Sequence, residues 1–164
     1  MIYSRLPSVN EYLQCMTNQG GERRDLAAML APLVRSLIAA ELPVLAAHGI
    51  SMWGYAVLST LDDSPVRTQT ALAEAIGADK TRIIGTLDEL QQSGLIARDP
   101  DPDDRRARLL SITPNGRKAR RSARAAIQAN EDRLLAQLSP ADRRAFLRAV
   151  QTLSTLSSED IVGS

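Results

Sequence analysis

The chain has very few of the residues that form covalent cross-links, metal sites and nucleophilic centres. Cys15 is the single cysteine and His48 the single histidine among 164 residues. One cysteine excludes an intramolecular disulfide and a cysteine-based zinc site. One histidine, with no nucleophile motif or phosphate-binding loop around it, provides no basis for a catalytic triad. We therefore expect no enzyme activity, no metal site and no cofactor.

Aromatic side chains and long apolar runs are also scarce. Aromatic residues make up 3% of the chain, whereas apolar residues as a whole make up 44%. Leucine and alanine supply most of this apolar content, which favours helices over sheets. No apolar run approaches the roughly 18 residues of a membrane span, and we expect no secretion signal. The expectation is a soluble cytoplasmic protein without a membrane partner and long enough for one domain with a core.

Charge is nearly balanced over the whole chain but is unevenly distributed along it. The net charge is +1, yet residues 98–124 contain nine basic and four acidic side chains. A basic zone on a near-neutral chain is typical of a protein that binds a polyanion. A solvated, arginine-rich helix face would have the same composition and is the alternative interpretation.

Hydrophobic periodicity predicts a mainly helical chain. The first long helix is predicted over about 23–48, and we expect Pro32 and Pro43 to break or kink it because each removes a backbone donor. Residues 1–21 are interpreted as an N-terminal extension. Further helices are predicted at 52–62, 69–76, 80–93, from 114 to about 137, and 140–156. Their expected N-capping residues are Ser51, Thr68, Asp79, Thr113 and Ser139.

The middle of the chain has the order of elements of a winged helix. The helices 69–76 and 80–93 are joined by Gly77-Ala78-Asp79, which is the spacing of a helix-turn-helix. Two short predicted strands, 95–98 and 108–112, follow and are joined by a charged hairpin. The predicted fold is therefore mainly α with a small antiparallel β-hairpin wing.

The second helix of this pair is predicted to have two different sides. We expect its apolar residues Ile83, Ile84, Leu87 and Leu90 to face the core. Its N-terminal exposed side offers cations and hydroxyl groups at the positive end of a helix: Lys80, Thr81, Arg82 and Thr86. Such groups are suited to phosphate contacts and to base-edge contacts in a major groove. The alternative is a surface helix whose polar residues simply face solvent.

Residues 51–121 resemble the core of the MarR (multiple antibiotic resistance regulator) transcription factors. The resemblance rests on ALAEAIGADKTRIIGTLDELQQSGLIARDPDPDDRRARLLSITPNGR at 71–117. The matching elements agree in order and spacing: Leu72-Ala73-Glu74, Asp79-Lys80-Thr81, Leu90…Gly94-Leu95-Ile96, Asp104-x-Arg106 and Ile112-Thr113…Gly116. At Gly85 the sequence departs from the family, in which a basic residue is common, so no contact is assigned there.

The resemblance implies a homodimer that binds a pseudo-palindromic operator, usually represses transcription, and is released by a small anion, often an aromatic acid, or by an oxidant. It implies a winged helix-turn-helix DNA-binding domain at 51–113, flanked by a helical dimerisation region at 22–50 and 114–164. The C-terminal apolar residues exceed what two terminal helices could bury alone, so we expect a second copy to cover them. These dimerisation residues are Leu134, Leu138, Phe146, Val150 and Leu153.

The composition of the hairpin segment DPDPDDRRARL is typical of a wing that contacts DNA. Arg105, Arg106 and Arg108 near its tip can place a guanidinium in the narrow, negative minor groove. By the resemblance, Arg106 is the inserted residue and Asp104 orients it. The alternative is a hairpin whose charges only keep the loop soluble. The full predicted DNA-binding set is Thr68, Lys80, Thr81, Arg82, Thr86, Arg105, Arg106 and Arg108.

By the resemblance, the effector pocket of the family lies near His48, Met52 and Trp53, which are therefore candidates for binding an effector. The alternative is that Trp53 is an ordinary core residue. Cys15 suggests a redox-sensing regulator, but it lies 36 residues before Ser51, which does not fit the spacing of the family's redox-sensing branch. A winged helix that binds another protein rather than an operator is the remaining alternative function.

Overall fold

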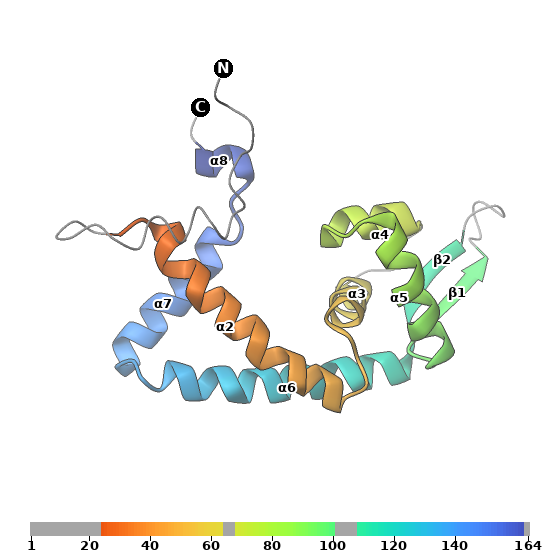
Figure 1. Ribbon diagram of the computed structural model, residues 1–164, viewed down its shortest axis with the longest axis horizontal. Coiled ribbons are helices and arrows are strands. Elements are labelled where there is room, and N and C mark those ends of the chain that lie inside the picture. The colour runs from red at the N-terminus through yellow and green to blue at the C-terminus, as the bar shows by residue number, and fades with distance from the viewer. Residues whose placement is uncertain (1–23, 64–67, 101–107, 163–164) are drawn as a thin grey trace, which may run out of the picture. The chain divides into compact units, whose positions relative to one another are not determined.

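The computed structural model describes residues 24–63, 68–100 and 108–162 (Figure 1). The chain forms two compact units, divided between Ala123 and Arg124. The elements of the first unit are α2 (Leu26–Ala47), α3 (Met52–Asp63), α4 (Gln69–Ile76), α5 (Lys80–Gln92), β1 (Ile96–Pro100), β2 (Arg108–Ile112) and the start of α6 (Pro114–Leu135). The second unit holds the rest of α6, α7 (Pro140–Leu153) and α8 (Ser158–Val162).

The core of the first unit lies among α3, α4, α5 and the two strands, which Figure 1 shows gathered side by side. Each element contributes apolar side chains at its own period, every third or fourth residue on a helix and every second on a strand. The buried apolar residues of this group are Val57, Leu58, Leu61, Leu72, Ala73, Ile83, Leu87, Leu90, Ile96, Leu110 and Ile112. Burial of one such large side chain stabilises the fold by about 1.5–3 kcal/mol.

The helix-turn-helix forms as the sequence predicts. Gly77 ends α4 in the left-handed conformation with a φ of 66°, which a residue without Cβ adopts at little cost. Asp79 then caps α5 by accepting a hydrogen bond from the Arg82 N–H at 2.8 Å. The three-residue link therefore ends one helix and starts the next, which fixes the angle at which α5 leaves α4.

The two strands form the predicted antiparallel hairpin. Ile96 pairs with Ile112 and Pro100 with Arg108, so the hairpin is in register along its whole described length. β1 extends to Pro100, two residues beyond the predicted end. The tip of the hairpin, which carries Asp104, Arg105 and Arg106, lies outside the described residues.

The start of α6 is attached to the end of α5 and the beginning of β1. The Thr113 Oγ1 accepts a hydrogen bond from the Gly116 N–H at 3.0 Å, and the hydroxyl lies 2.7 Å from the Gly94 carbonyl oxygen, to which it donates. Gly116 is buried here, and a Cβ at this position would lie 2.0 Å from the Leu95 carbonyl oxygen. Only glycine allows α6 to approach the chain this closely.

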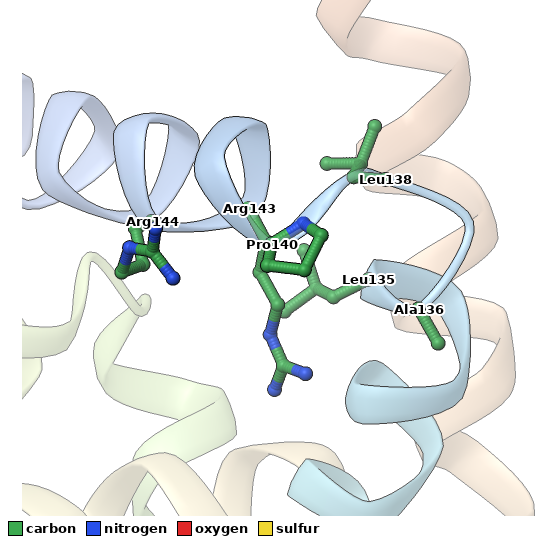
Figure 2. Close-up of a pocket in the computed structure, with 6 residues that line it drawn as sticks. All are labelled: Leu135, Ala136, Leu138, Pro140, Arg143 and Arg144. Atoms are coloured by element: carbon green, nitrogen blue, oxygen red, sulfur yellow. The ribbon is translucent and has the colours of Figure 1, made fainter.

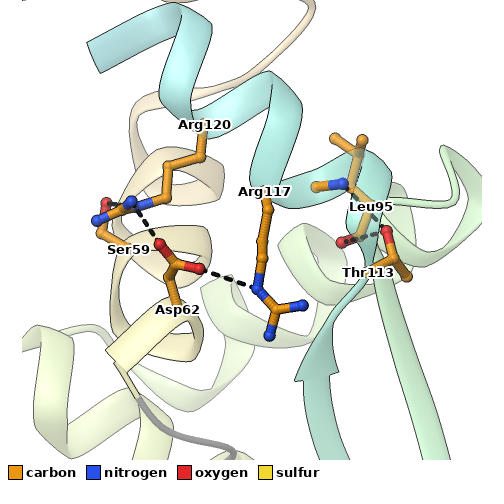
Figure 3. A network of polar contacts seen from close by, with 7 residues as sticks. Ser59, Asp62, Leu95, Thr113, Arg117 and Arg120 are labelled. Carbon is orange, nitrogen blue, oxygen red and sulfur yellow. Dashed lines mark hydrogen bonds and ion pairs between the residues drawn. The ribbon is translucent and has the colours of Figure 1, made fainter.

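A second connection joins α6 to α3 through an ion-pair network (Figure 3). Asp62 accepts from Arg120 at 2.6 Å and from Arg117 at 3.1 Å, one arginine on each carboxylate oxygen. The Arg120 Nε also lies 3.4 Å from the Ser59 hydroxyl. Since the Arg120 side chain is only 11% exposed, this pair lies mostly out of water and holds the two helices in one position.

α2 corrects one expectation from the sequence. It runs as one helix from Leu26 to Ala47, so neither Pro32 nor Pro43 breaks it. It is also long and apolar enough, by length and composition, to cross a membrane, although Arg35 and Glu41 interrupt its apolar residues. Its exposed large apolar side chains are Leu26, Met29, Leu30, Val34, Ile38 and Leu42.

The second unit is built around the turn between α6 and α7. Ser139 caps α7 by accepting from the Asp142 N–H at 3.2 Å, and Pro140 follows at the start of the helix, as predicted. Arg143 of α7 pairs with Asp132 of α6. α7 ends at Leu153 rather than at residue 156, and α8 was not predicted.

Candidate nucleic-acid interface

The first turn of α5 presents a cation at the positive end of a helix. The Arg82 side chain is 56% exposed, and its Nε lies 3.5 Å from the Asp79 carboxylate that caps the helix. Lys80 and Thr81 occupy the two positions before it. An exposed guanidinium at a helix N-terminus suits a phosphate or a base edge, because the charge and the helix dipole attract the same anion.

An aromatic ring supports this arginine from the neighbouring helix. The Arg82 guanidinium carbon lies 5.4 Å from the centroid of the Trp53 ring, within the range of a cation–π interaction. Trp53 is half-buried on α3. Trp53 was predicted to be a core or an effector residue, and its contact with Arg82 was not predicted, because nothing in the local spacing shows which residue of α3 lies next to α5.

Two other residues of α5 differ from expectation. Ile84, predicted to face the core, is 48% exposed, and Thr86, predicted to be exposed, is only 8% exposed. At about 100° per residue, position 86 lies about 40° around the helix from the buried position 90, whereas position 84 lies about 120° from it. Thr86 tolerates burial because its hydroxyl donates to the Arg82 carbonyl oxygen at 3.1 Å.

An ion pair joins α5 to the wing. Arg98 of β1 donates to Asp88 of α5 at 2.5 Å, and the Arg98 side chain is 21% exposed. The Nε atom of Arg98 is buried without a hydrogen-bond partner in the part of the chain that the structure describes. The ion pair of Arg98 with Asp88 therefore connects the first wing strand to α5.

These ion pairs show that part of the positive charge at 98–124 has a structural use. Arg98, Arg117 and Arg120 belong to that zone, and each pairs with an acid outside it, on α5 or α3. The charge of this segment therefore partly stabilises the fold instead of being available to a polyanion. Sequence could not separate the two uses, since both require arginine.

The remaining predicted DNA contacts are only partly described. Thr68 is exposed, and its Oγ1 caps α4 by accepting from the Ala71 N–H at 3.0 Å. Lys80 and Thr81 lie in the first turn of α5 and Arg108 begins β2, but their side chains lie outside the described parts of the structure.

The predicted effector residues lie at the end of α2 and the start of α3. His48 is the C-capping residue of α2, with Nδ1 2.8 Å from the Val44 carbonyl oxygen and Nε2 3.1 Å from the Ser122 hydroxyl of α6. Met52 and Trp53 are both half-buried. Among residues 24–63, 68–100 and 108–162 no group of acids, histidine or cysteine could hold a metal ion.

A pocket of about 480 Å³ lies at the turn between α6 and α7, apart from these residues in the sequence (Figure 2). Its lining combines apolar side chains with two arginines: Leu135, Ala136, Leu138, Pro140, Arg143 and Arg144. Leu138 is one of the predicted dimerisation residues. Arg143 is already paired with Asp132, so Arg144 supplies most of the free positive charge of this lining.

Comparison with known proteins decides the family. Residues 50–107, which include the helix-turn-helix and the first strand of the wing, match the model of the MarR family. A Thauera aromatica protein named for transcriptional regulation of the hcr operon is 30% identical over 137 residues, which are 84% of this chain and 78% of that protein. The chain belongs to the MarR family of transcriptional regulators. This confirms the resemblance and the prediction that the protein is a regulator and not an enzyme.

Two solved structures of a transcriptional repressor share the fold of this chain. The repressor CouR bound to a 23-mer DNA duplex is 30% identical, with a TM-score of 0.65 over 79% of this chain and 92% of that one. CouR from Rhodococcus jostii RHA1 bound to p-coumaroyl-CoA is 26% identical, with a TM-score of 0.64 over 81% and 94%. The predicted fold class is therefore confirmed.

Proposed function

We propose that this MarR-family regulator binds a pseudo-palindromic DNA operator as a homodimer, represses transcription in the cytoplasm, and is released by a small aromatic or anionic ligand. The observation that carries the proposal is Arg82, an exposed cation at the N-terminus of α5 that rests on Trp53. A cation held in place before binding loses less conformational entropy when it meets DNA.

The proposed DNA contacts come from the two ends of the winged helix. Lys80, Thr81 and Arg82 at the start of α5 would enter the major groove, and Thr68 at the start of α4 would contact the backbone. Arg105, Arg106 and Arg108 of the wing would contact the minor groove, with Asp104 orienting Arg106. Thr86 is left out of the contact set, because its buried hydroxyl already has a partner.

The homodimer is proposed from apolar surface that a single chain leaves uncovered. Within the second unit, the predicted dimerisation residues Leu134, Leu138, Val150 and Leu153 are each at least 42% exposed, and Phe146 is half-buried. α2 adds its own row of exposed apolar side chains. Contact with a second copy would remove this surface from water, and it accounts for the apolar character of α2 without a membrane.

The effector is proposed to bind near His48, Met52 and Trp53. Trp53 touches Arg82, so a ligand that displaced the indole would also disturb the cation that faces DNA. The complex of CouR with p-coumaroyl-CoA, an acyl-CoA carrying both an aromatic ring and phosphate groups, supports an aromatic or anionic ligand for this chain. A redox signal through Cys15 is the second regulatory hypothesis, although Cys15 lies outside the described residues.

The proposal is tested by selecting bound duplexes from a random DNA pool. We expect the protein to recover a pseudo-palindrome, to bind it at two subunits per duplex, and to lose affinity steeply as salt rises, because bound cations release counterions from the phosphates. Light scattering should give twice the mass of one chain, and Leu138→Glu should shift it toward monomer. Failure to select any sequence, or an affinity independent of salt, would contradict operator binding.

A further inference from the structure

We propose that Ile84 reads the C5-methyl group of a thymine in the major groove, so that the operator carries one required thymine in each half-site. The inference rests on the proposed DNA binding and adds a residue that determines specificity. It begins from a side chain whose exposure the hydrophobic pattern does not explain.

Ile84 is the apolar residue that α5 does not bury. Its neighbours in the same helix, Ile83, Leu87 and Leu90, are between 0% and 5% exposed, whereas Ile84 is 48% exposed. A large exposed isoleucine on a helix that has a complete buried face contributes little to the fold of the single chain. Its surface is available for a partner that offers an apolar group.

The residue beside it has no side chain. Gly85 is exposed, and a Cβ built there would meet nothing within 4 Å. Packing therefore does not require glycine at this position, and a mid-helix glycine costs about 1 kcal/mol relative to alanine. The outer surface of α5 thus has one apolar projection at Ile84 next to bare backbone at Gly85, which would let a base edge come close to the helix.

Helical spacing places this pair on the face that continues from the first turn. Positions 81, 84, 85 and 88 share one side of α5, since they are three or four residues apart. At the far end of that side, Asp88 is held by Arg98 of the wing strand. At the near end, the helix begins with Lys80, one turn before Ile84, whereas the exposed cation of Arg82 lies about 160° around the helix from Ile84. Positive charge at the entry and an apolar group one turn later complement a DNA groove better than an apolar protein surface.

The chemical groups that each base presents in the major groove determine which base Ile84 would favour. In the major groove thymine alone presents a methyl group, whereas cytosine and adenine present amino donors and guanine presents acceptors. Isoleucine cannot satisfy a donor or an acceptor, so it would favour thymine by burying the methyl and disfavour the other bases by desolvating their polar edges. Its branched Cβ also restricts χ1, which lowers the entropy lost on contact.

The test removes only the methyl group. In the selected operator, each thymine is replaced in turn by deoxyuridine, which keeps the base-pairing edge. We expect one position per half-site at which the wild-type protein loses about fourfold in affinity, the effect of burying a single methyl group. In Ile84→Ala the same replacement should change affinity little, while Ile84→Val should retain most of the loss.

Ile161→Ala is the matched control, because Ile161 is also exposed, at 70%, but lies on α8. It should keep the full uracil effect, and thermal melting should show that each variant remains folded. Equal uracil effects in wild type and Ile84→Ala, or no thymine whose methyl matters, would overturn the inference while leaving operator binding intact. A protein that selects no duplex at all would refute the proposed function itself.

Discussion

The guanidinium of Arg82 on α5 lies 5.4 Å from the centre of the Trp53 ring on α3. The contact joins two helices of the winged helix at the position where the second one starts. Asp79, which caps α5, also lies beside this arginine, with a carboxylate oxygen 3.5 Å from the Arg82 Nε. Arg82 is therefore held by a ring and a carboxylate before any ligand is bound.

Replacing Trp53 should weaken operator binding through this contact. A cation–π interaction at a partly exposed site is worth about 0.5–1 kcal/mol, so Trp53→Leu should lower affinity about two- to fivefold per subunit. Trp53→Phe should recover most of it, because a smaller ring still presents an aromatic face. The measurement is a gel-shift titration of both variants. Unchanged affinity in Trp53→Leu would show that the ring does not position Arg82.

The same contact provides a spectroscopic signal. Trp53 is the single tryptophan of the chain, so intrinsic tryptophan fluorescence reports on this site alone. Arg82→Ala should change that fluorescence in the free protein and should abolish any change caused by DNA. An emission spectrum that is identical in wild type and Arg82→Ala would argue against the contact in solution.

Removal of Asp62 should destabilise the first unit, because Arg120 would stay largely buried without a counter-charge. A fully buried pair broken on one side costs about 3–5 kcal/mol; with the Asp62 side chain 23% exposed, we expect about 2–3 kcal/mol for Asp62→Ala. The control is Asp132→Ala, which removes an acid that is 62% exposed and should cost less than about 1 kcal/mol. Urea unfolding measures both, and equal losses would contradict the importance of burial.

Two glycines should respond oppositely to alanine. Gly116→Ala would place a methyl 2.0 Å from the Leu95 carbonyl oxygen, so α6 must shift, and we expect a loss of about 2–4 kcal/mol. Gly85→Ala meets nothing within 4 Å in the middle of a helix and should raise stability by up to about 1 kcal/mol. Thermal melting distinguishes the two, and a neutral Gly116→Ala would mean that the junction of α6 with the wing is looser than described.

Arg106→Ala should lower operator affinity by about 10- to 100-fold without affecting the oligomeric state, if the wing inserts this arginine into the minor groove. Arg148→Ala is a suitable control, since it removes an exposed arginine from α7. A gel-shift titration gives the affinities and light scattering the mass. Equal affinity of Arg106→Ala and wild type would contradict the wing assignment.

Local chemistry in the sequence was enough to place five of the helices, α3 to α7, and their starts. Ser51, Thr68, Asp79, Thr113 and Ser139 were predicted as capping residues, and each accepts the backbone hydrogen bond of a cap. The order of helix-turn-helix, hairpin and long helix followed from the same local signals. These features depend on residues within a few positions of one another, so the sequence by itself determined them.

Only the tertiary structure decided how individual side chains are used. The exposure of Ile84 and the burial of Thr86 depend on how α5 is rotated about its own axis against α3 and α4. A rotation of a fraction of a turn would bury Ile84 and expose Thr86 instead. Other contacts join positions on separate helices. They are the ion pairs of Arg117 and Arg120 with Asp62 and the contact of Arg82 with Trp53. A contact between distant positions is set by how the helices pack, and that information is not present in any single stretch of sequence.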